Sequence, residues 1–323
     1  MSDRVFAELE AAWDWRAARG ILGELEAVRV FYGPGEGSGG LRSLAVDRFG
    51  SHYWITQWEE KKGVAPALSK ELEVFLTGKG ASSAVSLWRP EKGVPAEPEI
   101  LFGVPPADKF QIVEDGVRFW VQLLGVRHPG LFLDHLPLRQ WLRVRSRGWR
   151  VLNCFAYTGS LSIAACLGGA SHVCTLDLSK PAVRWAEENW KLNSLSSEVG
   201  KFIAGDVFEW LPRLKRQGEK FDCVILDPPS FSRGEKGSFS TAKDLKKLHE
   251  LVFGLLSPGG FVVSSINSAG VSMAKFEADV LAAAVACGRR CEVLRRIELP
   301  ETFPTRLEEP GERYLKGVIL RVW

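Results

Sequence analysis

The feature that most constrains the fold is a regular alternation of short apolar runs with longer amphipathic segments from about residue 110 onward. Such an alternation predicts a doubly wound α/β sheet, mostly parallel, with helices on both faces. The last two runs, 292–299 and 315–322, lack a helical segment between them, so an antiparallel edge is expected. The other strands are expected at 151–155, 173–177, 202–204, 223–227 and 260–266, and the helices at 136–145, 160–167, 181–193, 207–215, 241–256 and 274–287.

The first third of the chain has a different pattern, which predicts a small α+β domain. A glycine-rich loop at 33–40 is expected to be flexible, and Asp115-Gly116 predicts a tight hairpin turn. The stretch 91–108 is rich in proline and is the expected linker. We therefore divide the chain into a small α+β domain, 1–108, and a larger domain, 109–323. In the small domain, helices are expected at 6–19 and 67–77, and strands at 27–32, 43–48, 52–59 and 84–89.

The composition is that of a globular cytoplasmic protein. Hydrophobic residues make up 46% of the 323 residues and charged residues 25%. No run approaches the roughly 20 apolar residues of a membrane helix, and the acidic, amphipathic start is unlike a signal peptide. The six cysteines have irregular spacing, which favours thiols in a reducing compartment and gives no metal-site pattern.

The net charge of +3 decides little, but the basic residues cluster in the larger domain. The clusters lie at 139–150, 213–220, 243–247 and 289–296. Clusters of this kind are typical of a surface that binds a polyanion. Solvated helix faces are the alternative explanation for any one of them.

Acidic residues stand at the ends of three successive expected strands. Asp177 follows the glycine-bearing turn by about 20 residues, which is the place of a carboxylate that binds a ribose diol. Asp206 ends the next strand and could accept from an adenine amino group, and Asp227 completes the row. A cap on the following helix would explain Asp177 or Asp206 taken singly. Together they favour a nucleoside with a charged tail, and the missing G-x-G-x-x-G pattern favours S-adenosylmethionine over NAD.

The turn Asp227-Pro228-Pro229-Ser230-Phe231 follows an apolar strand. Each proline fixes φ and lacks an N–H donor, so the turn is stiff and its acceptors are held in place. Acceptors beside an aromatic ring suit an unstacked base. A plain strand-to-loop turn with a core Phe231 is the alternative. Phe231 and Phe239 flank a polar segment, 232–238, that is expected to be mobile and able to close over substrate.

These motifs resemble the class I S-adenosylmethionine-dependent methyltransferases, whose sheet is Rossmann-like. More narrowly, they are similar to bacterial enzymes that make 5-methylcytosine or 7-methylguanine in large-subunit rRNA. The resemblance covers about 110–323, and residues 27–60 are similar to the small domain that precedes the catalytic domain there. Its marks are G-L-F-L-D at 130–134 with Arg139, V-L-N-C-F-A-Y-T-G at 151–159, L-D-L-S-K-P at 176–181, Glu188-Asn189, Leu192-Asn193, G-D-V at 205–207, L-D-P-P-S-F-S at 226–232 and R-Y-L-K-G at 313–317.

The resemblance implies roles for individual residues. Asp134 and Arg139 would cap the cofactor, and Arg139 would pair with the methionine carboxylate. Asp227 would lie near the methionine amino group and the target base, together with Pro228, Pro229 and Phe231. The remaining cofactor residues would be Phe155, Tyr157, Thr158 and Gly159 in the pocket, Asp177 and Leu178 at the ribose, and Asp206 and Val207 at the adenine.

The chain departs from the resembling enzymes in two ways. Many of them begin with an RNA-binding PUA domain, whereas the first residues here already match the middle domain. Cytosine-C5 methylation needs a cysteine nucleophile, and Asn267 stands where the related cytosine enzymes have that cysteine. Because a ring nitrogen has its own lone pair, Asn267 favours methylation of guanine at a ring nitrogen.

The sequence therefore predicts a cytoplasmic S-adenosylmethionine-dependent methyltransferase. Its expected partner is RNA, either 23S rRNA or a large-subunit precursor particle, without a membrane or a metal. A methyltransferase acting on protein or a small molecule stays open, as does an RNA-binding assembly factor without catalysis. NAD-dependent oxidoreduction is disfavoured because the phosphate-binding glycines are missing. The oligomeric state is open.

Overall fold

The structure is a computed structural model that describes residues 2–58, 66–90, 97–234, 237–268, 270–306, 308 and 314–323. The chain divides into two compact units. The first comprises Met1–Asp134 and Leu299–Glu312, and the second comprises His135–Glu298 and Arg313–Trp323. The functional border between residues 108 and 109 that the sequence suggests stays a prediction.

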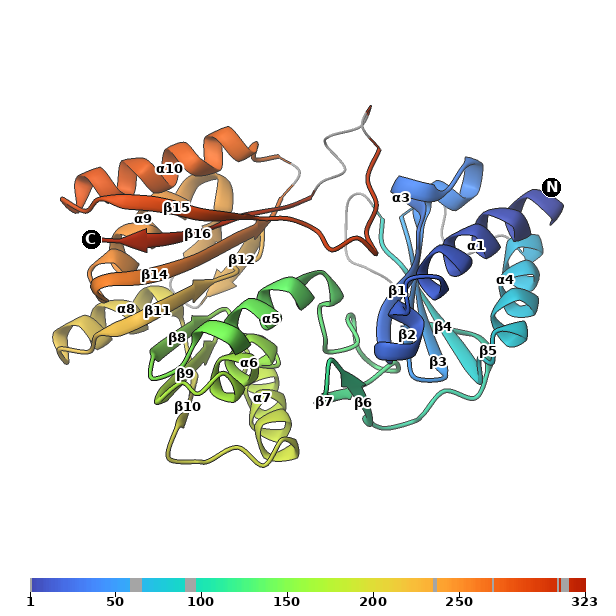
Figure 1. The fold of residues 1–323 in the computed structure, drawn as a ribbon, viewed down its shortest axis with the longest axis horizontal. Coiled ribbons are helices and arrows are strands. Elements are labelled where there is room, and N and C mark those ends of the chain that lie inside the picture. Colours follow the sequence, from blue (N-terminus) through green and yellow to red (C-terminus); the bar gives the residue numbers. More distant parts are fainter. Residues whose placement is uncertain are drawn as a thin grey trace. The chain divides into compact units, whose positions relative to one another are not determined.

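The first unit is built on a five-stranded sheet in the order β1-β2-β3-β4-β5. Helices α1 and α4 pack together on this sheet (Figure 1), and their apolar side chains join those of the strands in one core. Strands β3 and β4 are parallel because α4 crosses between them, and the other pairs are antiparallel. The elements are α1 Ser2–Ala17, α2 Ile21–Glu24, β1 Ala27–Tyr32, α3 Gly33–Glu36, η1 Gly39–Ser43, β2 Leu44–Phe49, β3 His52–Gln57, α4 Pro66–Gly78, β4 Ser83–Trp88, β5 Glu99–Gly103, β6 Phe110–Glu114, β7 Val117–Val121 and η2 Leu133–His135.

A hairpin confirms one turn prediction in this unit, and a strand corrects another. Strands β6 and β7 pair across Asp115 and Gly116, which have φ of 50° and 73°. The expected linker 91–108 is wrong over Glu99–Gly103, because these residues form β5 and pair with β4 at the edge of the sheet. Residues 91–96 of that stretch lie outside the described residues.

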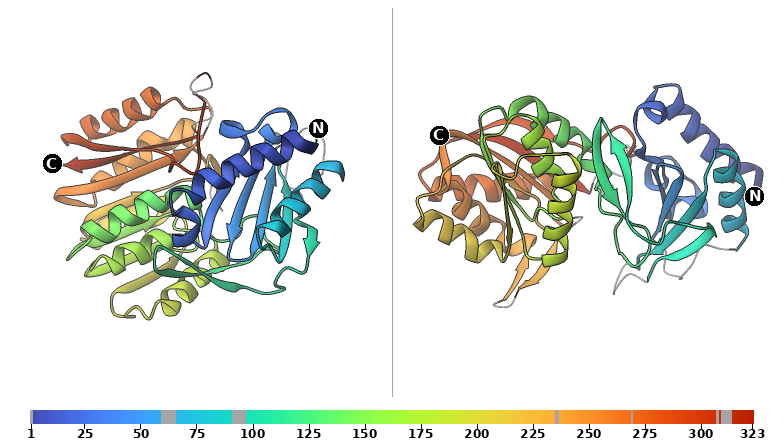
Figure 2. Two further views of the ribbon diagram at one scale, coloured as in Figure 1. Left: turned by 45° about the vertical axis from the view of Figure 1, so that its right-hand side comes forward. Right: turned by 90° about the horizontal axis from the view of Figure 1, so that it is seen from below.

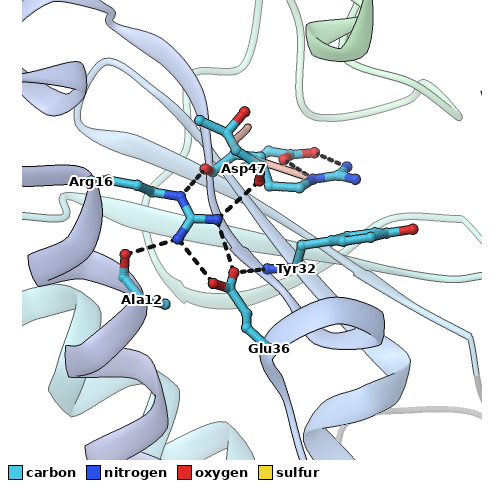
Figure 3. Close-up of polar contacts among 7 residues, drawn as sticks. Ala12, Arg16, Tyr32, Glu36 and Asp47 are labelled. Carbon is cyan, nitrogen blue, oxygen red and sulfur yellow. Dashed lines mark hydrogen bonds and ion pairs between the residues drawn. The ribbon is translucent and has the colours of Figure 1, made fainter. Parts of the chain in front are cut away.

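The glycine-rich loop is ordered by close packing, contrary to the flexibility expected of it. A Cβ on Gly35 would lie 1.8 Å from the Pro304 carbonyl oxygen, so only glycine permits this contact. The Arg16 guanidinium is fully buried and donates to the carboxylate of Glu36 and to the carbonyl of Thr302 at 2.9 Å (Figure 3). It also donates to the carbonyls of Ala12 and Arg29. The segment 299–306 is thereby held on the loop.

The second unit is built on a seven-stranded sheet in the order β10-β9-β8-β11-β14-β16-β15. Helices α5, α6 and α7 cover one face and α8, α9 and α10 the other (Figures 1 and 2). Only β16 runs antiparallel among the described strands of this sheet, between β14 and β15. The elements are α5 Leu136–Arg145, β8 Arg150–Cys154, α6 Ser160–Leu167, β9 His172–Asp177, α7 Lys180–Leu192, β10 Gly200–Ala204, α8 Val207–Arg216, β11 Phe221–Leu226, β12 Phe231–Gly234, β13 Gly237–Ser240, α9 Thr241–Phe253, β14 Leu256–Asn267, α10 Met273–Ala286, β15 Cys291–Ile297 and β16 Leu315–Val322.

The doubly wound sheet and its antiparallel edge are therefore confirmed. The sheet's central strands are buried on both faces, as their continuous apolar runs predicted. No helix among the described residues is both long and apolar enough to cross a lipid bilayer.

Candidate active site

The order of the strands places a reversal point between β8 and β11. From β8 the chain winds outward through β9 to β10, then returns to the other side of β8 as β11. At such a point the connections that follow two neighbouring strands leave on opposite faces, which opens a crevice for ligands at the carboxyl edge. The loop that begins at Phe155 follows β8, and Asp227 follows β11.

The strand register aligns the predicted residues in one row. Leu176, Cys154, Leu226 and Ser264 are neighbours across four adjacent strands. One residue further along each strand stand Asp177, Phe155, Asp227 and Ser265. The structure thus brings two of the three predicted carboxylates to one edge with the loop after β8, and Asp206 follows β10 at the same edge.

The loop after β8 has a backbone that few residues adopt. Phe155 and Tyr157 have φ of 58° and 50°, in the left-handed region, and Gly159 has φ of 79°. Thr158 is buried, and its carbonyl accepts a hydrogen bond of 3.1 Å from the Asn189 side chain of α7. Non-glycine residues persist in this region only when their surroundings hold them, and such residues concentrate at ligand sites.

Asp177 holds this loop with its carboxylate. Oδ2 accepts from the Tyr157 backbone N–H and Oδ1 from that of Ser179, both at 2.8 Å. The helix-cap explanation of Asp177 is wrong, because Ser179 is the N-cap of α7 and accepts from the Ala182 N–H. Burial raises the pKa of Asp177, and the two backbone hydrogen bonds oppose that rise. Leu178 beside it is 43% exposed, an apolar side chain open at the carboxyl edge.

Asp206 does cap a helix. Its Oδ1 accepts from the Phe208 N–H at 2.8 Å, at the start of α8. Val207 is buried in the core, whereas Phe208 is half-buried. The capping explanation accounts for one oxygen of Asp206, and the predicted contact with adenine stays a prediction.

Asp227 lies between two residues that the sequence interpretation missed. Its Oδ1 accepts a hydrogen bond of 2.7 Å from the Ser265 hydroxyl, and its Oδ2 lies 3.5 Å from Nε2 of His135. The rule that found Asp177 points to Asn267 at the end of β14 and misses Ser265, which lies inside that strand. No local signal pointed to His135.

The Asp-Pro-Pro-Ser turn also contacts Asn267. The Ser230 hydroxyl donates to the Asn267 carbonyl, so the end of β14 meets this turn. Pro228 is buried, whereas Pro229 and Asn267 are exposed. Phe231 begins β12, but its side chain and that of Phe239 lie outside the described residues.

The segment 232–238 is not the irregular loop that its composition suggested. Strands β12 and β13 pair in an antiparallel hairpin, with Ser232 opposite Phe239. Residues 235 and 236 between them lie outside the described residues. A polar composition does not prevent a hairpin here, because its strands are joined by pairing between backbone groups.

Arg139 and Asp134 belong to different units. Arg139 on α5 is 3% exposed, so it is not the solvated helix arginine that was its alternative. Asp134 ends the first unit and is also buried. Their predicted places over the cofactor stay predictions.

The thiols are poor nucleophiles. All six cysteines are free, and burial raises the pKa of each of them. Cys154 ends β8 but is fully buried in the core, and burial raises the pKa of Cys223 above that of a free thiol. Across the described part of the chain, no group of His, Cys, Asp and Glu side chains is arranged to hold a metal ion.

The basic clusters divide between the two edges of the sheet. Arg150 begins β8, and α8 ends at Arg216, so both lie at the amino edge, away from Asp177 and Asp227. Lys243, Lys246 and Lys247 lie in the first turns of α9, at the carboxyl edge. The Lys247 Nζ is 6.0 Å from the Phe208 ring, next to Asp206.

Comparisons with known proteins agree with this geometry. A family model described as S-adenosylmethionine-dependent methyltransferase matches residues 28–317. The "Ribosomal RNA large subunit methyltransferase" of Deinococcus radiodurans is 34% identical over 333 residues, which cover 98% of this chain and 78% of that protein. The "Ribosomal RNA large subunit methyltransferase I" of Aeromonas salmonicida is 33% identical over 233 residues, 72% of this chain and 59% of that protein.

Solved structures share the fold. A protein described as a methyltransferase and complexed with SAH has a TM-score of 0.89 at 24% identity, over 99% of this chain and 81% of that one. A protein of Streptococcus mutans described as SAM-dependent has a TM-score of 0.86 at 24% identity, with the same coverage. The resemblance inferred from the motifs and the preference for S-adenosylmethionine are confirmed. The chain belongs to the S-adenosylmethionine-dependent methyltransferase family.

Proposed function

We propose that this methyltransferase methylates a ring nitrogen of a guanine in 23S rRNA or in a large-subunit precursor particle. The choice of a nitrogen rests mainly on one observation: no cysteine stands in the row of Asp177, Asp227 and Ser265 at the carboxyl edge. Methylation at cytosine C5 requires such a thiol, because the carbon is not nucleophilic unaided.

The RNA substrate is supported by the relatives and by charge. The curated relatives in Deinococcus and Aeromonas carry the names of large-subunit rRNA methyltransferases. Three exposed lysines, Lys243, Lys246 and Lys247, lie at the same edge as the site, where a phosphate backbone would meet them. Residues 1–108 would serve as the recognition domain for this RNA.

The residues of the site suit a direct transfer. S-adenosylmethionine supplies a methyl group bonded to a positively charged sulfur, which a ring nitrogen can take without a protein nucleophile. Asp177 would accept from the ribose hydroxyls, with Leu178 beside it, and Asp206 and Val207 would lie at the adenine. Arg139 would neutralise the methionine carboxylate. The loop Phe155–Gly159 would close the pocket, and positioning would supply most of the rate.

Asp227 would hold the methionine ammonium and the target base. Its carboxylate is fixed by Ser265, and the stiff Pro228-Pro229 turn presents carbonyl acceptors next to it. Asn267 meets this turn through Ser230, so a guanine could be held by polar groups on two strand ends. Phe231 would stack on the base.

The first experiment is methyl transfer from labelled S-adenosylmethionine to 23S rRNA from a strain that lacks the gene, followed by nucleoside mass spectrometry. We expect label in 7-methylguanosine with the wild type and none with Asp227→Ala. Label in 5-methylcytidine would contradict the nitrogen assignment, and Cys154→Ala and Cys223→Ala would then be tested. If the protein binds the cofactor but labels no RNA, the result would favour a protein or a small molecule as the substrate. Failure to bind the cofactor would favour an assembly factor.

A charge-reversal pair tests the RNA surface. Lys243→Glu/Lys246→Glu/Lys247→Glu changes the carboxyl edge, and Arg213→Glu/Lys215→Glu/Arg216→Glu changes the amino edge by the same charge. Each lost phosphate contact lowers the slope of log affinity against log salt by about 0.9 for B-form DNA and about 0.7 for single strands. We expect RNA affinity and its salt slope to fall only for the first set. Equal losses for both sets would show that charge acts without a defined surface.

A further inference from the structure

His135 and Asp227 meet at the carboxyl edge of the second unit. Nε2 of His135 lies 3.5 Å from Oδ2 of Asp227, with the imidazole side chain 7% and the carboxylate 23% exposed. The ring therefore lies on the buried side of the carboxylate, and the open side faces away from it. His135 is placed to act on Asp227 without reaching a ligand itself.

The backbone fixes the ring in this place. His135 ends η2 and is the N-cap residue of α5, and a proline follows at the start of that helix. Pro137 in the first turn of α5 fixes its own φ and restricts Leu136, the residue next to His135. Burial of the side chain removes most alternative rotamers. The imidazole is thus held before any ligand arrives.

The two partners divide the Asp227 carboxylate between them. Ser265 is fully buried and donates to Oδ1 at 2.7 Å, and His135 approaches Oδ2. An ionised carboxylate has about four lone-pair positions on its two oxygens. Ser265 occupies one position on Oδ1, and His135 stands beside Oδ2 at an ion-pair distance that is longer than an ordinary hydrogen bond, so the open side of the carboxylate is left for a ligand. Ser265 restrains one oxygen of the carboxylate, and His135 beside the other oxygen further limits its rotation about χ2.

We infer that His135 is a positioning residue that orients the Asp227 carboxylate toward the methionine ammonium of the cofactor. The inference rests on the proposed role of Asp227 and extends it. It assigns His135 no contact with cofactor or base. Removing the imidazole should therefore lower the affinity only for ligands that contact Asp227. A side chain with a donor in the same place should restore that affinity.

The test compares two ligands by calorimetry. S-adenosylhomocysteine carries the amino-acid group, and 5′-methylthioadenosine keeps the adenosine and sulfur but lacks that group. His135→Phe keeps an aromatic ring and removes the donor, whereas His135→Gln keeps a nitrogen at the same number of bonds from Cα. We expect His135→Phe to bind S-adenosylhomocysteine up to about fivefold more weakly, the loss typical of a single ion-pair contact. Binding of 5′-methylthioadenosine should stay within twofold, and His135→Gln should resemble the wild type.

Two further variants separate the outcomes. His172→Phe changes a half-buried histidine at the start of β9, at the amino edge, and should leave both affinities unchanged. Asp227→Asn should lose the preference for S-adenosylhomocysteine, and if it does not, the proposed role of Asp227 fails. If Asp227→Asn loses the preference but His135→Phe keeps it, the inference about His135 alone is overturned. Equal weakening of both ligands in a folded His135→Phe, or no recovery in His135→Gln, would also overturn it.

Discussion

The carboxylate of Asp177 accepts a hydrogen bond of 2.8 Å from the backbone N–H of Tyr157, so the end of β9 holds the loop that follows β8. The same carboxylate accepts from Ser179 through its other oxygen. Both oxygens thus shape the site before a ligand binds, and their remaining lone pairs are left for hydroxyl groups. The same residue therefore orders the loop after β8 and is the one proposed to bind the ribose.

Replacing Asp177 with Asn should weaken cofactor binding strongly. The amide has one acceptor oxygen, so either Tyr157 or Ser179 loses its partner and faces an NH₂ group instead. We expect the affinity for S-adenosylhomocysteine, measured by calorimetry, to fall about 10-fold to 100-fold. Asp222→Asn is the matched control, because Asp222 accepts from the Arg150 N–H at the amino edge of the same sheet. Equal losses in both variants would mean that general destabilisation, and not the site, is responsible.

Replacing Gly159 with Ala should destabilise the second unit and the loop. The φ of 79° disfavours a side chain, and the new Cβ would lie 2.8 Å from the Ala186 Cβ of α7. We expect the free energy of unfolding in urea to fall by about 2–4 kcal/mol, from backbone strain and overpacking together. Gly218→Ala isolates the first contribution, because Gly218 has φ of 75° and open space around its Cβ position. Its expected loss is about 1 kcal/mol, and a loss as large as that of Gly159→Ala would remove the packing argument.

The sheet and much of the site could be predicted because their signals are local. The strands β8, β9 and β11 are apolar runs that are buried on both faces, so each strand can be predicted from its own residues. Parallel strands end at one edge, and the residue after each run is then a candidate for the site. This reasoning reached Asp177 and Asp227 without any knowledge of the fold's details.

The rest depends on contacts between distant parts of the chain. His135 stands at the start of α5 and reaches Asp227 after β11 only in the folded sheet, in which β11 lies next to β8. The strand β5 forms by pairing with β4, and its apolar run at residues 100–102 is short and only partly buried. The prolines on both sides of this run favoured a linker instead. The basic clusters looked alike in the sequence, and only the direction of α8 and α9 separates them between the two edges.

Stability of the second unit should fall in mild acid because of His249. Burial lowers the pKa of this histidine to about 4, although its hydrogen bond to the Leu245 carbonyl opposes the change. Between that value and about 6.5, the ordinary pKa of histidine, the unfolded chain binds a proton that the folded chain does not, so the free energy of unfolding falls as pH falls. At about 1.4 kcal/mol per pKa unit, the loss by pH 4 is about 3 kcal/mol.

His249→Gln separates this contribution from those of the carboxylates. The variant should be less stable than wild type at pH 8, because His249 is fully buried and its Nε2 lies 3.0 Å from the Ser264 hydroxyl. The difference in unfolding free energy between the two proteins should shrink as pH falls from 6.5 to 4. A difference that stays constant over this range would show that His249 is not the titrating group.

Removing Arg16 should release the segment 299–306 from the first unit. Arg16→Met leaves the Glu36 carboxylate without its guanidinium and the Thr302 carbonyl without its donor (Figure 3). Breaking a fully buried pair costs about 3–5 kcal/mol. We expect a smaller loss here, about 2–3 kcal/mol, because Glu36 is 21% exposed and still accepts from the Tyr32 N–H. Limited proteolysis should then cut within 299–312 faster than in the wild type. Adding Glu36→Gln removes the stranded charge and should restore part of the stability, whereas a double variant no more stable than Arg16→Met would show that the carbonyl contacts, and not the ion pair, hold the segment.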